Sequence, residues 1–246
     1  SLAEWMATAT PSPSIPSWLA QSTPERGSRS SASWGAMSTP ETPASKELGY
    51  WSLLKGYPDF TRLFAARNIS LMGDWFNTLG LLALLRAAGD DSATSFGWVL
   101  IFKMLPVFLV APFAGVISDR FNRKGILIVS DALRCLIVLA MLIPWVGAHK
   151  EALYALVILQ AVGAAFSEPA RVALIPDIVP PRGIITAGAL SAASWSLMLA
   201  LGSALGGLTV DAFGWQITLL VDAGTYLFAV LILMGIKGGR AHLGAQ

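Results

Sequence analysis

The stretch GVISDRFNRKG, residues 115–125, decides the fold because it places charge between two long apolar runs. It holds Asp119, Arg120, Arg123 and Lys124, with a glycine at each end. Charged residues make up only 13% of the chain and hydrophobic residues 54%, whereas an ordinary soluble domain carries about 25% charged residues. This composition indicates an integral membrane protein, in which the charged stretch is a loop between two membrane-spanning helices.

Six apolar segments lie in the chain from residue 68 onward, and each is close to the ~20 residues that a helix needs to cross a bilayer. They cover residues 68–88, 96–118, 125–146, 152–172, 184–208 and 215–236. Because lipid cannot satisfy backbone N–H and C=O groups, such segments are expected to be helices. The predicted fold class is therefore an all-α integral membrane protein with six transmembrane helices over residues 68–236.

Lysine and arginine are distributed unevenly between the two sets of connections. One set of flanks carries ten basic residues, which are Lys55, Arg62, Arg67, Arg120, Arg123, Lys124, Arg171, Arg182, Lys237 and Arg240. The other set carries two, Arg86 and Lys150. Because basic residues are retained on the cytoplasmic side, we predict that both termini are cytoplasmic and that the chain passes several times through the plasma (inner) membrane.

The regions outside the apolar segments have different compositions. Residues 1–48 are rich in Ser, Thr, Pro and Ala and are predicted to be a disordered tail. Met37 would make a sensible native start, so we suspect that residues 1–36 are not native. Residues 49–67 are amphipathic and are predicted to be an interfacial lead-in. Residues 237–246 are expected to be a cytoplasmic tail or the start of a linker.

The residue inventory argues against an enzyme. The single cysteine, Cys135, excludes an intrachain disulfide and a cysteine-based metal site, and it lies in an apolar run. The sequence has no HExxH, GxSxG or phosphate-binding glycine loop. We therefore expect no catalytic residues, no cofactor, no bound metal and no nucleic-acid partner.

The pattern Gly115-x-x-x-Asp119-Arg120-x-x-Arg123-Lys124 resembles the signature loop of the major facilitator superfamily, which lies between its second and third helices. The stretches SLMGDWFNTLGLLAL (70–84) and EPARVALIPDIVPP (168–181) resemble its drug-exporter branch. The resemblance implies the N-terminal six-helix half of a twelve-helix transporter. Such a protein would export a small amphipathic or drug-like molecule by alternating access, driven by an ion gradient.

The resemblance also assigns the loop a role. In the family this loop latches the two halves together in the outward-open state, so the candidate latch residues are Gly115, Asp119, Arg120, Arg123 and Lys124. A small residue at 115 would let a neighbouring helix approach closely. The basic side chains would bind nearby carboxylates, and Glu168 and Arg171 are the candidate partners of Arg120 and Arg123. Asn122 replaces a family glycine, and asparagine tolerates a left-handed turn.

Two other motifs depart from the family. The fifth-helix stretch GSALGG keeps Gly202, Gly206 and Gly207 but has Ser203 in place of a proline. The spacing of Gly202 and Gly206 still predicts a face for close helix packing. In the fourth helix, Val157 stands where many proton-coupled members carry arginine.

Ionisable residues inside the apolar segments each require a reason, because they cost about 2.5–3.5 kcal/mol on insertion scales. Asp74 with Asn77 is the leading candidate for binding a substrate cation or a proton, and a purely structural polar cluster is the alternative. Gln160 is a weaker cavity candidate. Lys103 and Asp222 would pair if their helices touch, or else reach toward water.

Asp131 and Arg134 stand three residues apart in the third apolar segment. They are expected to form a local structural pair on one helix face.

A second function remains open from sequence alone. The chain could be a six-span protein complete in itself, acting as a homodimeric carrier or as a non-transporting assembly or interaction protein. In that case a second copy would cover the Gly202–Gly206 face. In either case the predicted partners are the lipid bilayer and either a C-terminal six-helix half or a second copy, together with a small-molecule substrate for a carrier.

Overall fold

The computed structural model describes residues 48–89 and 92–237. The predicted disordered tail, except residue 48, lies outside the described residues, as do Arg240 and residues 238–246. The side chain of Asp119 also lies outside them, although its backbone belongs to a helix.

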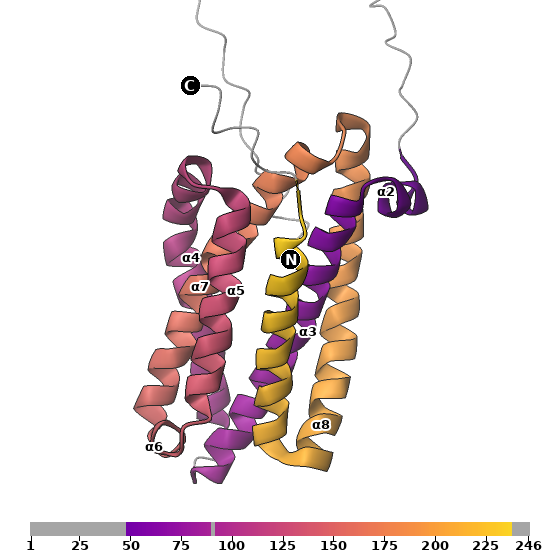
Figure 1. The fold of residues 1–246 in the computed structure, drawn as a ribbon. Helices are drawn as coiled ribbons and strands as arrows, with labels where there is room; N and C mark the ends of the chain where they lie inside the picture. Colours follow the sequence, from indigo (N-terminus) through magenta and orange to yellow (C-terminus); the bar gives the residue numbers. More distant parts are fainter. Residues whose placement is uncertain (1–47, 90–91, 238–246) are drawn as a thin grey trace, which may run out of the picture. The chain divides into compact units, whose positions relative to one another are not determined.

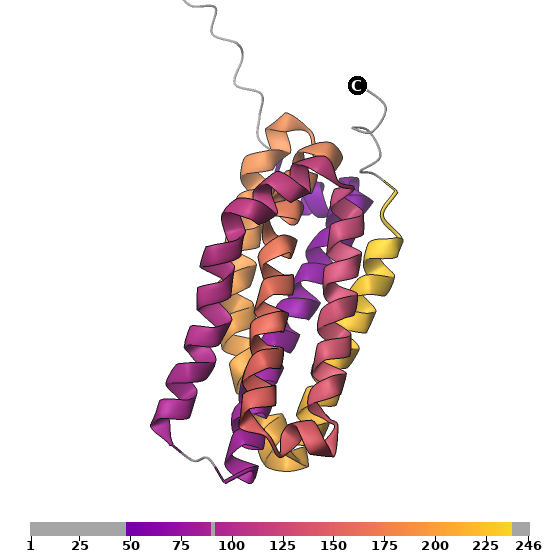
Figure 2. The same ribbon diagram turned by 90° about the vertical axis from the view of Figure 1, so that its left-hand side faces the viewer.

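Within the described ranges, every element is a helix and the connections between helices are short (Figures 1 and 2). The elements are α2 (Tyr50–Gly56), α3 (Pro58–Ala87), α4 (Ala93–Arg120), α5 (Arg123–Met141), α6 (Pro144–Gly147), α7 (Lys150–Ile178), the 3-10 turn η3 (Pro181–Gly183) and α8 (Ile184–Met234). The all-α class predicted from sequence is therefore confirmed.

Helix α8 bends sharply at Gly214, whose φ of 80° lies in the left-handed region that favours glycine. The bend divides α8 into a first arm, residues 184–213, and a second arm, residues 215–234. Figure 1 shows α3 between these two arms, and α8 is the main packing partner of α3. The arms correspond to the fifth and sixth apolar segments of the sequence.

Two of the differences between the predicted and the observed boundaries occur at prolines. The third apolar segment was expected to run to residue 146, but α5 ends at Met141 and α6 begins separately at Pro144. The lead-in 49–67 is divided between α2 and the first turns of α3, because Pro58 occupies the first turn of α3. Proline lacks a backbone N–H and restricts the residue before it, so it is favoured in the first turn of a helix.

Three of the described helical segments are long and apolar enough to cross a membrane: Thr94–Ser118, Lys150–Ile178 and Pro181–Met234. The third of these contains both arms of α8. Helices α3 and α5 are not among them. Both carry polar residues within their length, among them Asp74 and Asn77 in α3 and Asp131 and Arg134 in α5.

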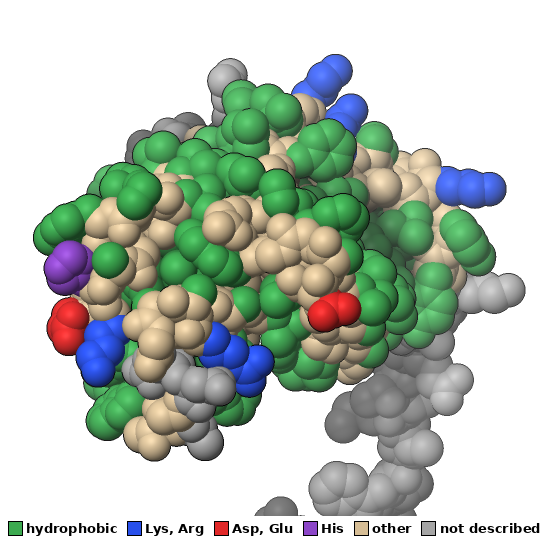
Figure 3. Space-filling model, turned by 90° about the horizontal axis from the view of Figure 1, so that it is seen from below, with side chains coloured by type: hydrophobic (Ala, Val, Ile, Leu, Met, Phe, Trp, Pro, Cys, Tyr) green, Lys and Arg blue, Asp and Glu red, His purple; other side chains and the backbone are tan. Residues whose placement is uncertain are grey.

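The bundle has an end where α4 meets α5, which we call the upper end, and an opposite lower end (Figure 1). Figure 3 looks onto the lower end and shows mainly hydrophobic and uncharged side chains, with few charged ones. The core beneath it joins four helices. Leu81, Leu85, Met141, Leu153 and Leu219 are each at most 1% exposed there.

Candidate functional site

An ion pair links α3 to α5 near the middle of the bundle. The Arg134 guanidinium donates a hydrogen bond to the Asp74 carboxylate, and the Tyr226 hydroxyl donates to the same oxygen at 2.5 Å. The Arg134 guanidinium also lies over the Tyr226 ring, 4.4 Å from its centre. Three helices are thus joined at one carboxylate. The sequence had singled out Asp74, but neither Arg134 nor Tyr226, as a site residue.

The predicted local pair of α5 is present beside this cluster. Arg134 Nη1 lies 3.7 Å from Asp131 Oδ1. Arg134 is 6% exposed and Asp131 is 1% exposed, so both charges are removed from solvent. Arg134 therefore serves two carboxylates, Asp131 on its own helix and Asp74 on α3.

A cavity of about 240 Å³ opens beside the ion pair. Its polar wall contains Asp74, Thr78, Lys103, Arg134 and Gln160. Its apolar wall contains Leu71, Trp75, Leu100, Met104, Val107, Ala161, Ala164 and Trp195. We call this space the central cavity. It combines a few charged groups with mostly apolar surface, which is the usual construction of a small-molecule site.

Lys103 contacts α3 rather than Asp222. Its ammonium donates to Thr78 Oγ1 at 2.7 Å, and the Thr78 hydroxyl bonds the backbone oxygen of Asp74 at 2.7 Å. Among the described residues, no carboxylate lies within 4.0 Å of the Lys103 ammonium. The pair with Asp222 suggested by their similar depth is therefore not formed, because Lys103 reaches Thr78 on the cavity side of α3.

Asp222 lies in the contact between α3 and the second arm of α8, outside the cavity. It is fully buried, and neither carboxylate oxygen has a hydrogen-bond partner among the described residues. The missing side chain of Gly73 makes room for it, since a Cβ at Gly73 would lie 2.6 Å from Asp222 Oδ1. Asn77 is also fully buried and does not line the cavity. The two polar residues predicted together on α3 are thus separated, with Asp74 alone at the cavity.

Gln160 lines the central cavity, as its weaker candidacy suggested, and its amide donates to the Tyr226 hydroxyl at 3.2 Å. The residue is 3% exposed. Gln160 therefore supports the orientation of Tyr226, which in turn bonds Asp74.

The loop between α4 and α5 is fastened to two other helices at the upper end. Arg123 donates to Asp177 Oδ2 at 2.9 Å and to the backbone oxygen of Ala173 at 2.8 Å. Lys124 donates to the backbone oxygens of Met234 and Ile236, at 2.9 and 2.5 Å. The carbonyls at a helix C-terminus lack partners within the helix and carry partial negative charge, so a lysine there is stabilising.

The predicted partners of this loop were wrong. Glu168 pairs instead with Arg67 at 3.0 Å and with Arg171 at 3.6 Å, while Asp177 receives Arg123. Asp177 is on the same helix as Glu168, two to three turns nearer its C-terminus and so nearer the loop. The prediction therefore identified the correct helix, α7, but the wrong acidic residue on it.

One further expectation for the loop differs from the structure, and one stays a prediction. A Cβ at Gly115 would meet no atom within 4 Å among the described residues, so a close helix contact at Gly115 would have to come from outside them. Asn122 has a φ of −62° and caps α5 by accepting from the Gly125 N–H at 3.2 Å. It is an N-cap residue, not a left-handed turn residue. The Arg120 side chain is exposed.

The Gly202–Gly206 face packs inside the chain, against α3. A Cβ at Gly202 would lie 3.0 Å from Trp75 Cβ, and one at Gly206 would lie 3.4 Å from Phe76 Cα. A Cβ at Gly207 would meet nothing within 4 Å. The idea that this face meets a second copy is therefore wrong for these two glycines, because α3 already occupies it.

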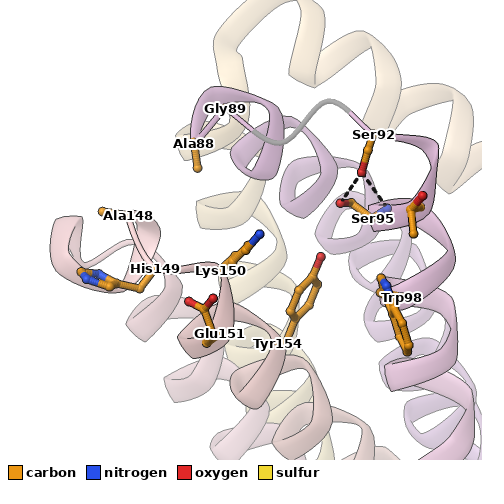
Figure 4. Close-up of a pocket in the computed structure, with 11 residues that line it drawn as sticks. Ala88, Gly89, Ser92, Ser95, Trp98, Ala148, His149, Lys150, Glu151 and Tyr154 are labelled. Atoms are coloured by element: carbon orange, nitrogen blue, oxygen red, sulfur yellow. Dashed lines mark hydrogen bonds between the residues drawn. The ribbon is translucent and has the colours of Figure 1, made fainter.

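A larger cavity of about 630 Å³ lies at the lower end, between the α3–α4 connection and the start of α7 (Figure 4). His149, Lys150, Glu151 and Tyr154 come from the α7 side, and Trp98 comes from α4. It is separate from the charged cluster of the central cavity. No group of three or more metal-ligating side chains occurs among the described residues.

Comparison with known proteins gives a consistent assignment. An uncharacterised MFS-type transporter of Bacillus subtilis is 27% identical over 184 residues, which cover 74% of this chain and 43% of the relative. An uncharacterised MFS-type transporter of Mycobacterium tuberculosis is 28% identical over 158 residues, or 62% of this chain and 35% of the relative. BacE of Bacillus subtilis, which is named as a bacilysin exporter, is 26% identical over 180 residues, or 73% and 44%.

The chain spans less than half of the length of these three relatives. The family model described as Major Facilitator Superfamily matches residues 63–242, which include the helices that build the central cavity. Members of this family are transporters and not enzymes. The chain belongs to the Major Facilitator Superfamily and is an integral, multi-pass membrane protein.

Proposed function

We propose that this chain forms the first six-helix half of a secondary transporter that exports a small amphipathic molecule by alternating access. The central cavity is the observation that carries the proposal. It is lined by Asp74, Arg134 and Lys103 within an apolar bundle, and ionisable groups inside such a bundle are costly and usually functional. Transporters of this kind bind substrate near the bilayer midplane, between their structural repeats.

The proposal assigns six membrane crossings to α3, α4, α5, α7 and the two arms of α8. Figure 1 shows the bend of α8 at the lower end, so both arms of α8 run along the height of the bundle. Lys124 and Arg123 belong to the upper end, as do the first residue of α3 and the last residues of α8. The positive-inside rule therefore places the upper end and both termini in the cytoplasm, with the protein in the plasma (inner) membrane.

Export and energy coupling rest on the family. The likeness to BacE, named as an exporter, supports outward transport, and an ion gradient is the energy source that family membership implies. A second six-helix half, or a second copy, would close the open side of the cavity. The α4–α5 loop would then act as the latch between halves, through Gly115 and Asp119 in particular. The reading as a self-contained assembly protein gains no support, because Gly202 and Gly206 are engaged within the chain.

The test is a transport assay in cells that express the complete gene. Efflux of the amphipathic cation ethidium and of neutral and zwitterionic dyes would be measured with and without a proton gradient. Asp74→Asn should abolish gradient-driven efflux, whereas Lys150→Met, at the separate cavity of the lower end, should retain it. Efflux of every transported dye that is unchanged in Asp74→Asn would remove the cavity from the mechanism.

A further inference from the structure

We propose that the central cavity binds a small zwitterionic molecule, with its carboxylate on Lys103, its ammonium group on Asp74 and its apolar part against the hydrophobic wall. The inference rests on the proposed function, since it names the substrate class of the same cavity. Nothing in the family assignment specifies this chemistry. It follows from the charges that line the cavity and from their remaining hydrogen-bonding capacity.

Lys103 supplies a positive charge that forms no ion pair among the described residues. Its ammonium group has three donors, and one of them bonds Thr78 Oγ1. No carboxylate among the described residues lies within 4.0 Å of it, although Asp74 and Asp222 act on it from further away. Of the charged residues that line the cavity, Arg134 contacts Asp74 and also Asp131, whereas Lys103 has no ion-pair partner among the described residues. A ligand carboxylate would give Lys103 such a partner through a charge-assisted hydrogen bond.

Asp74 retains an acceptor for a cation of the ligand. Its Oδ1 receives both Arg134 and Tyr226, and no hydrogen bond to its Oδ2 is formed among the described residues. The side chain is 30% exposed, so it is reachable from the cavity. Because Arg134 already offsets its charge, Asp74 is expected to orient an ammonium group more than to attract a ligand by itself.

The separation of the two groups suits an amino acid. Lys103 binds at Thr78, which lies four residues from Asp74 on α3, and four residues advance the helix by about 6 Å. An ammonium group and a carboxylate on one carbon, each with its own hydrogen bond to the protein, fit between such groups. Leu100, Met104 and Val107 provide an apolar wall for a side chain.

The test uses three probes that share a phenyl group. Phenylalanine carries both charges, 3-phenylpropanoate carries only the carboxylate and phenethylamine carries only the ammonium group. Binding to the detergent-purified product of the complete gene would be measured by calorimetry. The variants are Lys103→Met, Lys103→Arg and Asp74→Asn. Lys150→Met is the matched control, because Lys150 lines the separate cavity at the lower end. Helix content by circular dichroism would verify folding of each variant.

We expect phenylalanine to bind at least about tenfold more tightly than phenethylamine, with 3-phenylpropanoate between them. Lys103→Met should weaken phenylalanine binding at least about tenfold while leaving phenethylamine unchanged. Lys103→Arg and Lys150→Met should each stay within a few-fold of the unmodified protein. Asp74→Asn should remove the advantage of phenylalanine over 3-phenylpropanoate.

Equal affinity for phenylalanine and phenethylamine, or binding of phenylalanine that survives Lys103→Met, would overturn the inference. The absence of phenylalanine binding at about 10 mM would overturn it as well. These outcomes are separate from the proposed function, because calorimetry requires no transport. If efflux depends on Asp74 but binding shows no preference for carboxylates, the proposed transport function would stand and the proposed zwitterionic substrate would be wrong.

Discussion

Replacing Gly202 by alanine should destabilise the protein, whereas the same change at Gly207 should not. The two positions lie in the interior of the same arm of α8, five residues apart, but on different faces. The new Cβ at 202 would lie 3.0, 3.1 and 3.2 Å from three atoms of Trp75, and the one at 207 would meet nothing within 4 Å. Trp75 Cβ is attached to the backbone, so α3 itself would have to move.

The expected difference can be estimated from two opposing terms. Alanine is favoured over glycine in a helix interior by about 1 kcal/mol, and this gain is the same at both sites. Overpacking of a closely fitted contact costs about 1–3 kcal/mol, and this cost applies only at 202. Gly202→Ala should therefore lie about 1–3 kcal/mol below Gly207→Ala in stability, which corresponds to a difference of roughly 3–10 °C in Tm for a chain of this size.

The single cysteine provides the assay. Cys135 is only partly exposed on α5, so a thiol-reactive fluorescent dye should report its exposure as the detergent-solubilised protein is heated. Size-exclusion chromatography of both variants would follow the oligomeric state. Equal melting temperatures for the two variants would refute the packing of α3 on Gly202. A change of oligomeric state in Gly202→Ala alone would instead support contact with another subunit.

Two further predictions concern the ion pairs and use the same melting assay. Arg134→Met should lower the free energy of unfolding by about 3–5 kcal/mol, because it leaves Asp74 without its cation, and adding Asp74→Asn should recover part of this loss; no recovery would contradict the pairing. Arg123→Gln should cost about 1–3 kcal/mol, because the Asp177 carboxylate loses a charged donor. Arg120→Gln, at an exposed position, should change stability by less than about 0.5 kcal/mol, and an equal loss in both loop variants would contradict the assignment.

The order and approximate limits of the helices could be predicted because each depends on local sequence. A run of apolar residues bounded by charge or proline marks a helix wherever it occurs, and the gap between residues 208 and 215 indicated the bend that Gly214 makes. The end of α5 at Met141 could not be placed by hydropathy, because the apolar run continues past it. The decisive residue, Pro144, acts through its backbone and not through its polarity.

The site was predicted less well because its contacts join residues that are distant in sequence. Asp74 and Lys103 could be selected from the sequence because each is an ionisable residue within an apolar segment. Arg134 was assigned to Asp131, since a pair three residues apart is visible in the sequence, whereas its bond to Asp74 spans 60 positions. The sequence did not indicate a role for Tyr226 in the site, because tyrosine is a common residue in apolar segments.

The glycines of α3 explain why the charged cluster forms on this helix. Gly73 lets the second arm of α8 approach so closely that a Cβ would lie 2.6 Å from Asp222 Oδ1, and Gly80 continues this contact two turns further along, 3.2 Å from Leu219. This approach brings the Tyr226 hydroxyl within 2.5 Å of the Asp74 carboxylate. Asp74 is the residue directly after Gly73, so it faces the edge of that contact and not its centre. Close packing on one face of α3 thereby fixes the position of the carboxylate on the adjoining face, where the cavity lies. The positions that shape this site therefore include glycines that contribute no functional group to it.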